Sequence, residues 1–316
     1  MDVSEVLVDY LHDIRHLSQG TRQQYQYHLT EFAQWTAQEG IHLEQVNNRV
    51  VQSFLEWVRA THKPHKNGKE ALSTRTLVGY VQSLKAFLNW CFNDEEYGDL
   101  VTLKTIKRLK MPKSEQFLKE VFTDEELAAL FEACKDHSKP HEYQLRDMAI
   151  VAVLIDTGVR ASELRTLQIG HVFLARDAKE DSYIKVMGKG RKEREIPLGN
   201  RARRALNRYI RQYRKNTKKT DPVFWSRQGG PLAPVSLKDI LVRLRDLAGL
   251  PEDLDVNLHK FRHSYASRFI ANGGDIYDLS RLMGHSSVAV TEHYLKTIGT
   301  TAVRKRKDRR SVLDEL

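Results

Sequence analysis

The sequence predicts a mostly α-helical protein of the α+β class with one small antiparallel sheet, and three observations support this prediction. Apolar residues recur at spacings of three and four along most of the chain, as they do in amphipathic helices. Two short alternating runs within residues 182–199 give the one clear signal for β-strands. Glycine and proline are few, 17 and 8 among 316 residues, which argues against a disordered or fibrous chain.

Residues 1–102 are predicted to form a domain that is a bundle of helices. With Thr21 as its N-cap, one apolar stripe runs from Tyr25 to Trp35, and Gly40 ends the helix. Two further stripes run through Val50, Phe54, Leu55 and Val58, and through Leu77, Tyr80, Val81, Leu84, Phe87 and Leu88. Stripes at helical spacing indicate core packing, and nothing in this region points to catalysis.

Residues 103–118 are predicted to be a basic interdomain linker. The segment is rich in lysine, contains Pro112 and shows little apolar periodicity. A linker of this composition either lies along the phosphates of a nucleic acid or stays in solvent, and the sequence leaves both alternatives open.

A second domain is predicted over residues 119–316. Thr123 and Glu126 form a capping box at its start, and a buried helix, a glycine-containing break and a second helix start follow. The β-hairpin is expected around Gly188-Lys189-Gly190-Arg191, and helices continue to about residue 295. The tail, residues 297–316, is basic and ends in an apolar and acidic stretch where Val312, Leu313 and Leu316 are spaced for a small helix face.

The charge of the chain suggests a polyanionic partner. Its formal net charge is +10, and nearly all of the excess lies in the second part, because residues 1–114 carry 14 Lys and Arg against 13 Asp and Glu, whereas residues 115–316 carry 37 against 28. The chain has no apolar run long enough to span a membrane, and its acidic N-terminus is unlike a signal peptide. We therefore expect a cytoplasmic protein, associated with the nucleoid if it is bacterial.

The two cysteines, Cys91 and Cys134, lie far apart in the sequence, and neither belongs to a CxxC or Cys/His cluster. They are predicted to be buried free thiols rather than a disulfide or a zinc site.

Four separated segments supply side chains that are suited to holding a phosphodiester: TGVRASEL (157–164), GKGRKER (188–194), LHKFRHSYASRF (258–269) and LMGHSSVAVTEHYL (282–295). Their candidate residues are Arg160, Lys189, His259, Arg262, His285 and Tyr294. Each has an ordinary explanation when taken alone, as a surface arginine, a turn lysine or a packed tyrosine. Their joint presence, with His259 and Arg262 three residues apart on one helical face, is far more specific.

Taken together, the four segments resemble the tyrosine recombinase family, which comprises phage integrases and Xer-type recombinases. RDMAIVAVLIDTGVRASEL resembles the family's first arginine box, LHKFRHSYAS its H-x-x-R box, and LMGHSSVAVTEHYL the stretch that ends in the nucleophile. The resemblance covers the whole second domain and, more loosely, the helical first domain. It implies the arginine pair Arg160 and Arg262, the histidines His259 and His285, the hairpin lysine Lys189 and the nucleophile Tyr294. Glu163 matches an acidic position of the family, and we expect it to orient Arg160 or a histidine.

The chemistry of these residue types fits transfer of a phosphoryl group. Two guanidiniums stabilise negative charge on the non-bridging oxygens through paired, planar hydrogen bonds. Attack by Tyr294 gives a covalent protein–DNA ester, which the resemblance places at the 3′ phosphate. By the same resemblance Lys189 protonates the departing oxygen, His259 acts as base or proton shuttle, and His285 donates to a phosphate oxygen. The sequence contains no metal-ligand array or Walker loop, so neither a metal nor another cofactor is expected.

The partner that the resemblance implies is double-stranded DNA with a specific recombination site. The two domains would grip the duplex as a C-shaped clamp within a tetramer, and the tail would dock on a neighbouring subunit, although a disordered basic tail is an open alternative. Candidate contacts to the DNA backbone, which a solvated face would explain equally well, are Lys107, Arg108, Lys110, Arg191 and Arg194. Because the first domain begins almost at residue 1, we expect no additional arm-binding domain of the kind found in larger phage integrases.

Several alternatives stay open. Lys192 competes with Lys189 as the acid, and Tyr265 and Tyr277 are other hydroxyls, each expected to be packed on its helix. His263 and His293 are expected to be structural or exposed. Rival functions are a type IB topoisomerase and a non-catalytic DNA-binding regulator, while the target sequence and the biological role cannot be read from the sequence.

Overall fold

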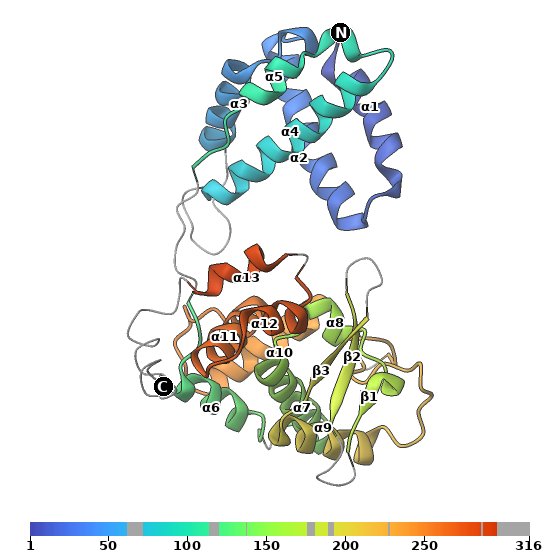
Figure 1. The fold of residues 1–316 in the computed structure, drawn as a ribbon, viewed down its shortest axis with the longest axis vertical. Coiled ribbons are helices and arrows are strands. Elements are labelled where there is room, and N and C mark those ends of the chain that lie inside the picture. The colour runs from blue at the N-terminus through green and yellow to red at the C-terminus, as the bar shows by residue number, and fades with distance from the viewer. Residues whose placement is uncertain are drawn as a thin grey trace, which may run out of the picture. The chain divides into compact units, whose positions relative to one another are not determined.

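The computed structural model describes residues 1–61, 72–113, 120–136, 138–175, 181–188, 193–226, 228–285 and 287–295. The chain divides into two compact units, Met1–Phe117 and Leu118–Leu316 (Figure 1). Each unit has its own hydrophobic core. We call them unit 1 and unit 2. The division falls within the predicted linker, residues 103–118, and the predicted tail lies outside the described residues.

All regular secondary structure in the described residues of unit 1 is helical. Its helices are α1 (Val3–Asp13), α2 (Gln19–Glu39), α3 (Asn48–Thr61), α4 (Thr74–Asn93) and α5 (Leu103–Arg108). The predicted stripes form the core, where Phe32 on α2, Phe54 on α3 and Phe87 on α4 are fully buried.

The predicted cap of α2 was wrong by three residues. Ser18 caps this helix, since its hydroxyl accepts a hydrogen bond from the amide of Thr21 at 3.3 Å. Gly40 ends the helix in the left-handed region, with a φ of 66°. A Ser-Gln-Gly-Thr run offers two possible caps, and only the backbone geometry decides between them.

Part of the predicted linker is folded. Residues 103–108 form α5, which Thr102 caps by accepting from the amide of Thr105. Ile106 and Leu109 are buried in the core of unit 1, and Asn48 accepts a hydrogen bond from the amide of Lys110. Two apolar residues three apart are too few for a visible periodicity, yet they suffice to dock one helical turn.

Unit 2 combines helices with a small sheet, which confirms the predicted α+β class. Its helices are α6 (Asp124–Ala133), α7 (His141–Thr157), α8 (Ala161–Arg165), α9 (Asn200–Tyr213), α10 (Pro234–Leu247), α11 (Leu258–Ala271), α12 (Ile276–Met283) and α13 (Val288–Leu295). The predicted capping box of α6, formed by Thr123 and Glu126, is present.

The sheet is antiparallel, with strand order β1 (Val172–Phe173), β2 (Tyr183–Met187) and β3 (Glu193–Pro197). In the predicted hairpin, Met187 pairs with Glu193 and Ile184 with Ile196. The two-residue strand β1 was not predicted, because so short a strand leaves no alternating pattern.

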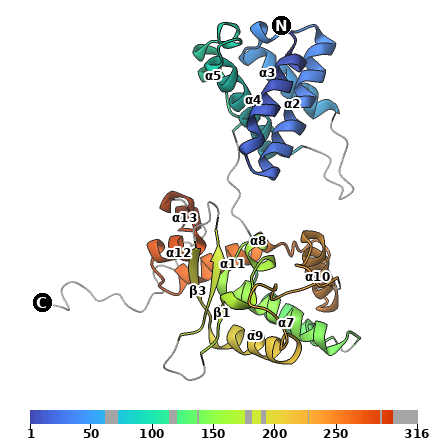
Figure 2. The same ribbon diagram turned by 90° about the vertical axis from the view of Figure 1, so that its right-hand side faces the viewer.

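Helix α7 is the central element of unit 2. Its apolar run Ala149–Leu154 is buried, since α9, α11 and α6 pack against this helix. Figure 2 shows α9 alongside α7. Helices α11, α12 and α13 contact one another, and α12 also contacts β3. The ends of α7, α12 and β3 are thereby brought into one region.

Both cysteines are buried free thiols, as predicted, and burial raises the pKa of each to about 12. Among the described residues, no helix is long and apolar enough to cross a membrane. The same residues contain no group of three or more His, Cys, Asp and Glu side chains arranged to hold a metal ion.

Candidate active site

The C-terminal end of α12 is the centre of the candidate site. Gly284 follows the helix with a φ of 61°, and the amides of Gly284 and His285 close the last turn on the carbonyls of Arg281 and Ser280. The final carbonyls of a helix lack partners within it and carry the negative end of its dipole. The C-terminal end of α12 therefore favours binding of cationic groups.

Three arginines from three different elements donate to three consecutive carbonyls at this end of α12. The pairs are Arg194 Nε to Leu282 at 2.7 Å, Arg262 Nη2 to Met283, and Arg160 Nη2 to Gly284 at 2.8 Å. We call this group the arginine cluster. Since each guanidinium stays charged at any physiological pH, the cluster is a permanent concentration of positive charge.

Arg160 enters the cluster from the N-cap position of α8. The chain turns sharply before it, because Gly158 ends α7 with a φ of 57°. The Arg160 side chain is 34% exposed, and its Nη1 donates to Glu163 at 2.9 Å. A guanidinium has five N–H groups, and the described side-chain contacts use two of them, so Arg160 retains donors for an anion in solvent.

Glu163 is the buried anion of the site, with only 2% of its side chain exposed. It accepts the Arg160 backbone amide as well as side-chain bonds from Arg160 and Arg194. Burial raises the pKa of Glu163, but the hydrogen bonds and charges of the two arginines outweigh it and lower the pKa to about 2. Of the two expected partners, Arg160 or a histidine, the structure places Arg160 against Glu163.

Arg262 is buried on α11 and joins the ends of two other helices. Its Nη1 donates to the carbonyl of Gly158 at 2.8 Å, while Nη2 lies 3.1 Å from Nε2 of His285. The Gly158 carbonyl is the last of the α7 turn, and Met283 is the last residue of α12. Arg160 and Arg262 therefore lie side by side, on adjacent carbonyls.

His285 is held as a neutral ring. Its Nδ1 lies 2.7 Å from Oγ1 of the buried Thr291, and its Nε2 faces the Arg262 guanidinium, which can only donate. Burial and the three neighbouring arginines lower the pKa of His285 to about 4. Donation from Nε2 to a phosphate oxygen, as expected from the sequence, requires the ring's other tautomer or a second proton.

The other predicted catalytic residues are placed less completely. His259 lies at an exposed position in the first turn of α11, one turn before Arg262. Tyr294 belongs to α13, but its side chain, like that of His293, lies outside the described residues. Lys189, Arg191 and Lys192 also lie outside them. The structure thus brings together Arg160, Glu163, Arg262 and His285.

The alternative hydroxyls differ in burial. Tyr265 is packed as expected: it lies against Gly158, and burial raises its pKa to about 12. Tyr277 is 62% exposed on α12, so the expected packing of this residue was wrong. His263 is partly buried on α11.

Arg194 is the member of the cluster that sequence reasoning placed differently, as a candidate for the DNA backbone. All three of its nitrogens donate to Glu163 or to the Leu282 carbonyl, and its side chain is 12% exposed. A signal was present: Arg194 pairs with the buried Val186 and shares a strand face with Ile196. A charged residue on the apolar side of a hairpin requires a buried partner.

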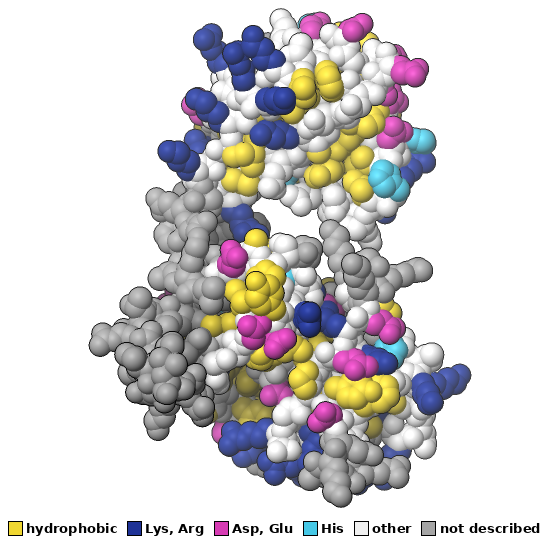
Figure 3. Space-filling model, in the orientation of Figure 1, with side chains coloured by type: hydrophobic (Ala, Val, Ile, Leu, Met, Phe, Trp, Pro, Cys, Tyr) yellow, Lys and Arg dark blue, Asp and Glu magenta, His cyan; other side chains and the backbone are white. Residues whose placement is uncertain are grey.

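Lys107, Arg108 and Lys110, the candidate DNA contacts in unit 1, are exposed. Figure 3 shows Lys and Arg side chains gathered on the face of unit 1 around α3 and α5. This is the arrangement that either a phosphate contact or a solvated face would show.

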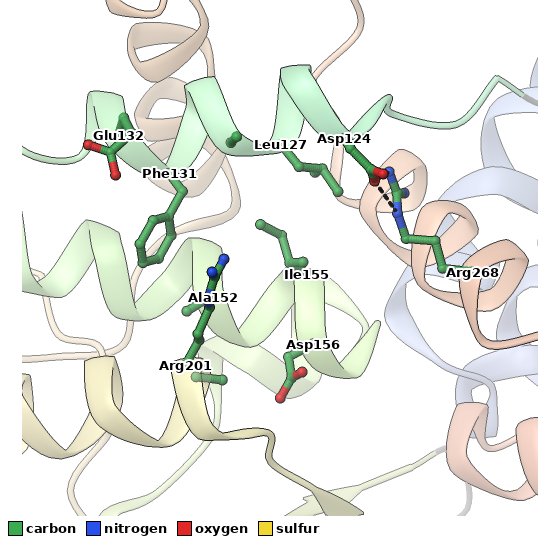
Figure 4. Close-up of a pocket in the computed structure, with 11 residues that line it drawn as sticks. Asp124, Leu127, Phe131, Glu132, Ala152, Ile155, Asp156, Arg201 and Arg268 are labelled. Carbon is green, nitrogen blue, oxygen red and sulfur yellow. Dashed lines mark hydrogen bonds and ion pairs between the residues drawn. The ribbon is translucent and has the colours of Figure 1, made fainter. Parts of the chain in front are cut away.

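A pocket of about 400 Å³ lies elsewhere in unit 2 and includes no predicted site residue. It is lined by residues of α6, α7, α9 and α11, among them Leu127, Phe131 and Ile155, and Arg268 pairs with Asp124 at its edge (Figure 4). The residues of the arginine cluster do not line this pocket.

Comparison with known proteins is consistent with this geometry. Residues 120–298 match the model of the phage integrase family, and residues 5–69 match the phage integrase N-terminal SAM-like domain. The chain is 29% identical to tyrosine recombinase XerD of Chlorobaculum tepidum over 92% of this chain and 90% of that protein.

Two solved structures share the fold. One is the XerH site-specific recombinase bound to a palindromic difH substrate in a post-cleavage complex, with a TM-score of 0.74 and 20% identity, covering 96% of this chain and 83% of that chain. The other is a lambda integrase tetramer bound to a Holliday junction, with a TM-score of 0.64 and 17% identity, covering 91% of this chain and 78% of that chain.

Proposed function

The chain belongs to the phage integrase family, and we propose that its arginine cluster binds the scissile phosphate of duplex DNA while Tyr294 attacks that phosphate. The activity is site-specific recombination, in which DNA strands are cut and rejoined through a covalent tyrosyl ester. The catalytic residues in this proposal are Arg160, Lys189, His259, Arg262, His285 and Tyr294.

One observation carries the proposal: Arg160 and Arg262 donate to adjacent carbonyls of Gly284 and Met283, and His285 follows directly in the chain. Two guanidiniums fixed beside each other can bind both non-bridging oxygens of one phosphate. Since Arg160 is held by a carboxylate and a backbone carbonyl, and Arg262 by backbone carbonyls and His285, they need little reorganisation when negative charge develops in the transition state.

The proposed reaction forms one phosphorus–oxygen bond and breaks another. The Tyr294 oxygen bonds to phosphorus, its proton passes to His259 or water, and the bond to the 5′ oxygen breaks. Lys189 gives its proton to the departing oxygen, which leaves a 3′-phosphotyrosyl ester and a 5′ hydroxyl. Attack by a 5′ hydroxyl of the partner strand reverses these steps and rejoins the DNA.

The working assembly we propose is a tetramer on two DNA sites, with the tail of each subunit docked on a neighbour. The exposed Lys107, Arg108 and Lys110 are proposed to contact backbone phosphates, as is Arg191. Binding should then weaken steeply as salt rises, because each phosphate contact releases counterions. For a bacterial protein with this activity, we propose association with the nucleoid, where its DNA substrate lies.

The test is to trap the covalent adduct on genomic DNA from the organism that encodes the protein. Wild-type protein should yield adducts at a defined sequence, found by sequencing the junctions, and Tyr294→Phe should yield none. Tyr265→Phe and Tyr277→Phe are the matched controls and should keep the adduct. EDTA should leave the yield unchanged, since the two guanidiniums supply the positive charge.

An adduct that persists in Tyr294→Phe would identify another nucleophile and reject the assignment. Adducts spread over random sequences, with relaxation of any supercoiled plasmid, would favour a type IB topoisomerase. DNA binding without any adduct from wild-type protein would favour a non-catalytic regulator.

A further inference from the structure

Arg194 is tied into the candidate site by every nitrogen of its side chain. Nη1 and Nη2 donate to the two carboxylate oxygens of Glu163, each at 2.8 Å, and Nε donates to the Leu282 carbonyl at 2.7 Å. The first two bonds form the parallel, bidentate arrangement that is the strongest contact between an arginine and a carboxylate.

The acceptors of Arg194 are also those that hold Arg160. Glu163 accepts Nη1 of Arg160, and the α12 end accepts Nη2 through the carbonyl of Gly284. A methyl group in place of the Gly284 hydrogen would lie 2.9 Å from Nη1 of Arg194 and 3.0 Å from its Cζ. The guanidinium of Arg194 therefore lies directly on the backbone that positions Arg160.

We propose that Arg194 is a positioning residue for Arg160, acting through the Glu163 carboxylate and the carbonyl end of α12. This inference rests on the proposed function. It replaces the contact between Arg194 and the DNA backbone that charge alone had suggested.

The physical reason lies in the geometry of the carboxylate. Arg194 occupies both oxygens of Glu163 from one side, so the Arg160 side chain makes a single bond to Oε1. Without Arg194, Glu163 would offer both oxygens to Arg160, which could then form the bidentate pair itself. Its guanidinium would turn toward Glu163 and away from the phosphate, and small misplacements of a catalytic group slow a reaction strongly.

The experiment compares Arg194→Ala with Arg243→Ala. Arg243 is a matched control, because it too shares a buried carboxylate, Asp147, with a second arginine, Arg146. The DNA is a nicked duplex carrying the junction sequence recovered from wild-type adducts. The measurements are the single-turnover rate of adduct formation, the dissociation constant at several salt concentrations, and the thermal midpoint.

Arg194→Ala should slow adduct formation by about 10- to 100-fold, because a misplacement of about 1 Å can slow a reaction by about 100-fold. Its affinity for DNA and the salt dependence of that affinity should stay at the wild-type values. Arg243→Ala should lose stability without any loss of rate at temperatures where it is folded. Arg194→Lys keeps the positive charge but cannot form the bidentate pair with Glu163, so its rate of adduct formation should lie between those of wild-type protein and Arg194→Ala. If Arg194→Ala fails to fold, Arg194→Lys takes its place in the comparison.

A second substrate distinguishes an effect on binding of the scissile phosphate from an effect on protonation of the leaving group. In a duplex with sulfur in place of the departing 5′ oxygen, the leaving thiolate needs no proton, because thiols are far more acidic than alcohols. Lys189→Ala should recover on this substrate, whereas Arg194→Ala should stay slow. In addition, the double variant Arg194→Ala with Glu163→Gln should be no slower than the slower single variant, since both changes act on one unit.

Three results would overturn the inference. An unchanged rate of adduct formation in Arg194→Ala would show that Arg194 does not position Arg160. Weaker binding with a salt slope shallower by about one would make Arg194 a DNA contact. Recovery of Arg194→Ala on the sulfur substrate would assign it to the leaving group. Failure of the proposed function would look different, because wild-type protein itself would then form no Tyr294 adduct.

Discussion

Two buried carboxylates of unit 2 are each held by two arginines, yet their settings differ. Asp147 lies in the middle of α7 and pairs with Arg146 and Arg243, while Glu163 lies in the first turn of α8 and pairs with Arg160 and Arg194. Burial raises the pKa of Asp147 in spite of its arginines, whereas the pKa of Glu163 is lowered to about 2.

The difference lies in what surrounds each pair. Glu163 also accepts the backbone amide of Arg160, which favours its charged form. The arginines around Asp147 have further side-chain partners: Arg146 lies 4.6 Å from the ring centroid of Tyr143, and Arg243 pairs with Asp136 at 3.2 Å. Those around Glu163 donate instead to the end of α12. Asp147 therefore shares its arginines with other side chains, whereas Glu163 shares its arginines with the end of α12 and contacts one cation, Arg160, that is partly exposed.

The largest effect is expected on the free energy of unfolding, when the buried carboxylate of Glu163 or Asp147 is replaced by a neutral amide. Glu163→Gln should lower the free energy of unfolding at pH 7 by about 3 kcal/mol, because the buried Arg194 and the partly exposed Arg160 both lose their anion. Asp147→Asn should cost less, since Arg243 keeps a second carboxylate, that of Asp136, whereas Arg160 and Arg194 keep only backbone carbonyls. Urea unfolding of both variants measures the difference, and equal losses would contradict the comparison.

Gly284→Ala should cost about 2 to 3 kcal/mol, from its φ of 61° together with the contact to Arg194. Gly249→Ala is the matched control, because Gly249 has a similar φ of 65° and nothing within 4 Å of its new methyl group. It should cost about 1 kcal/mol for the backbone conformation alone. Adduct formation should slow in Gly284→Ala only. Equal losses of stability in the two variants would show that the Arg194 side chain moves away from the new methyl group at no cost.

As the pH falls, the stability contributed by the site around Glu163 should be lost in two stages. His285 has a folded pKa of about 4 against an ordinary 6.5, so its contribution is complete above pH 6.5 and is lost as the pH falls toward 4. Glu163 has a folded pKa of about 2 against 4.5, so its contribution is lost below pH 4.5. Asp147, with a raised pKa, acts in the opposite sense and loses stability as the pH rises through its folded pKa.

The measurement is the urea midpoint of wild-type protein and His285→Gln between pH 7 and 4. The variant should lose less stability over this interval, because it no longer has a ring to protonate. His28 in unit 1, whose pKa burial also lowers, should continue to contribute in both proteins. Parallel curves would show that His285 is not held neutral.

The smallest effect is expected beside Arg194 on the same strand. Glu195 pairs with Lys185 at 3.3 Å, and 56% of the Glu195 side chain is exposed. Glu195→Gln should therefore change stability by less than about 0.5 kcal/mol and leave adduct formation unchanged. If Glu195→Gln also slowed adduct formation, any change in β3 would disturb the site. The effect of Arg194→Ala could then not be assigned to Arg194 itself.

The sequence by itself determined the fold class, most helices, the hairpin and the order of the four segments that resemble a recombinase. These features are local, because the stripes of unit 1 and the alternation in β2 and β3 repeat every few residues. The segments themselves were recognisable from residue types at short spacing, such as His259 and Arg262.

Only the tertiary structure decided how those residues meet. Arg160 and Gly284 are 124 positions apart, and Arg194 and Leu282 are 88 apart, so their hydrogen bonds leave no periodic trace in the sequence. The end of α12 gathers three guanidiniums because its carbonyls have no partners within the helix, a property of the backbone that no residue type records. For the same reason the partner of Glu163 had to be observed, since a buried carboxylate requires a cation but does not specify which one.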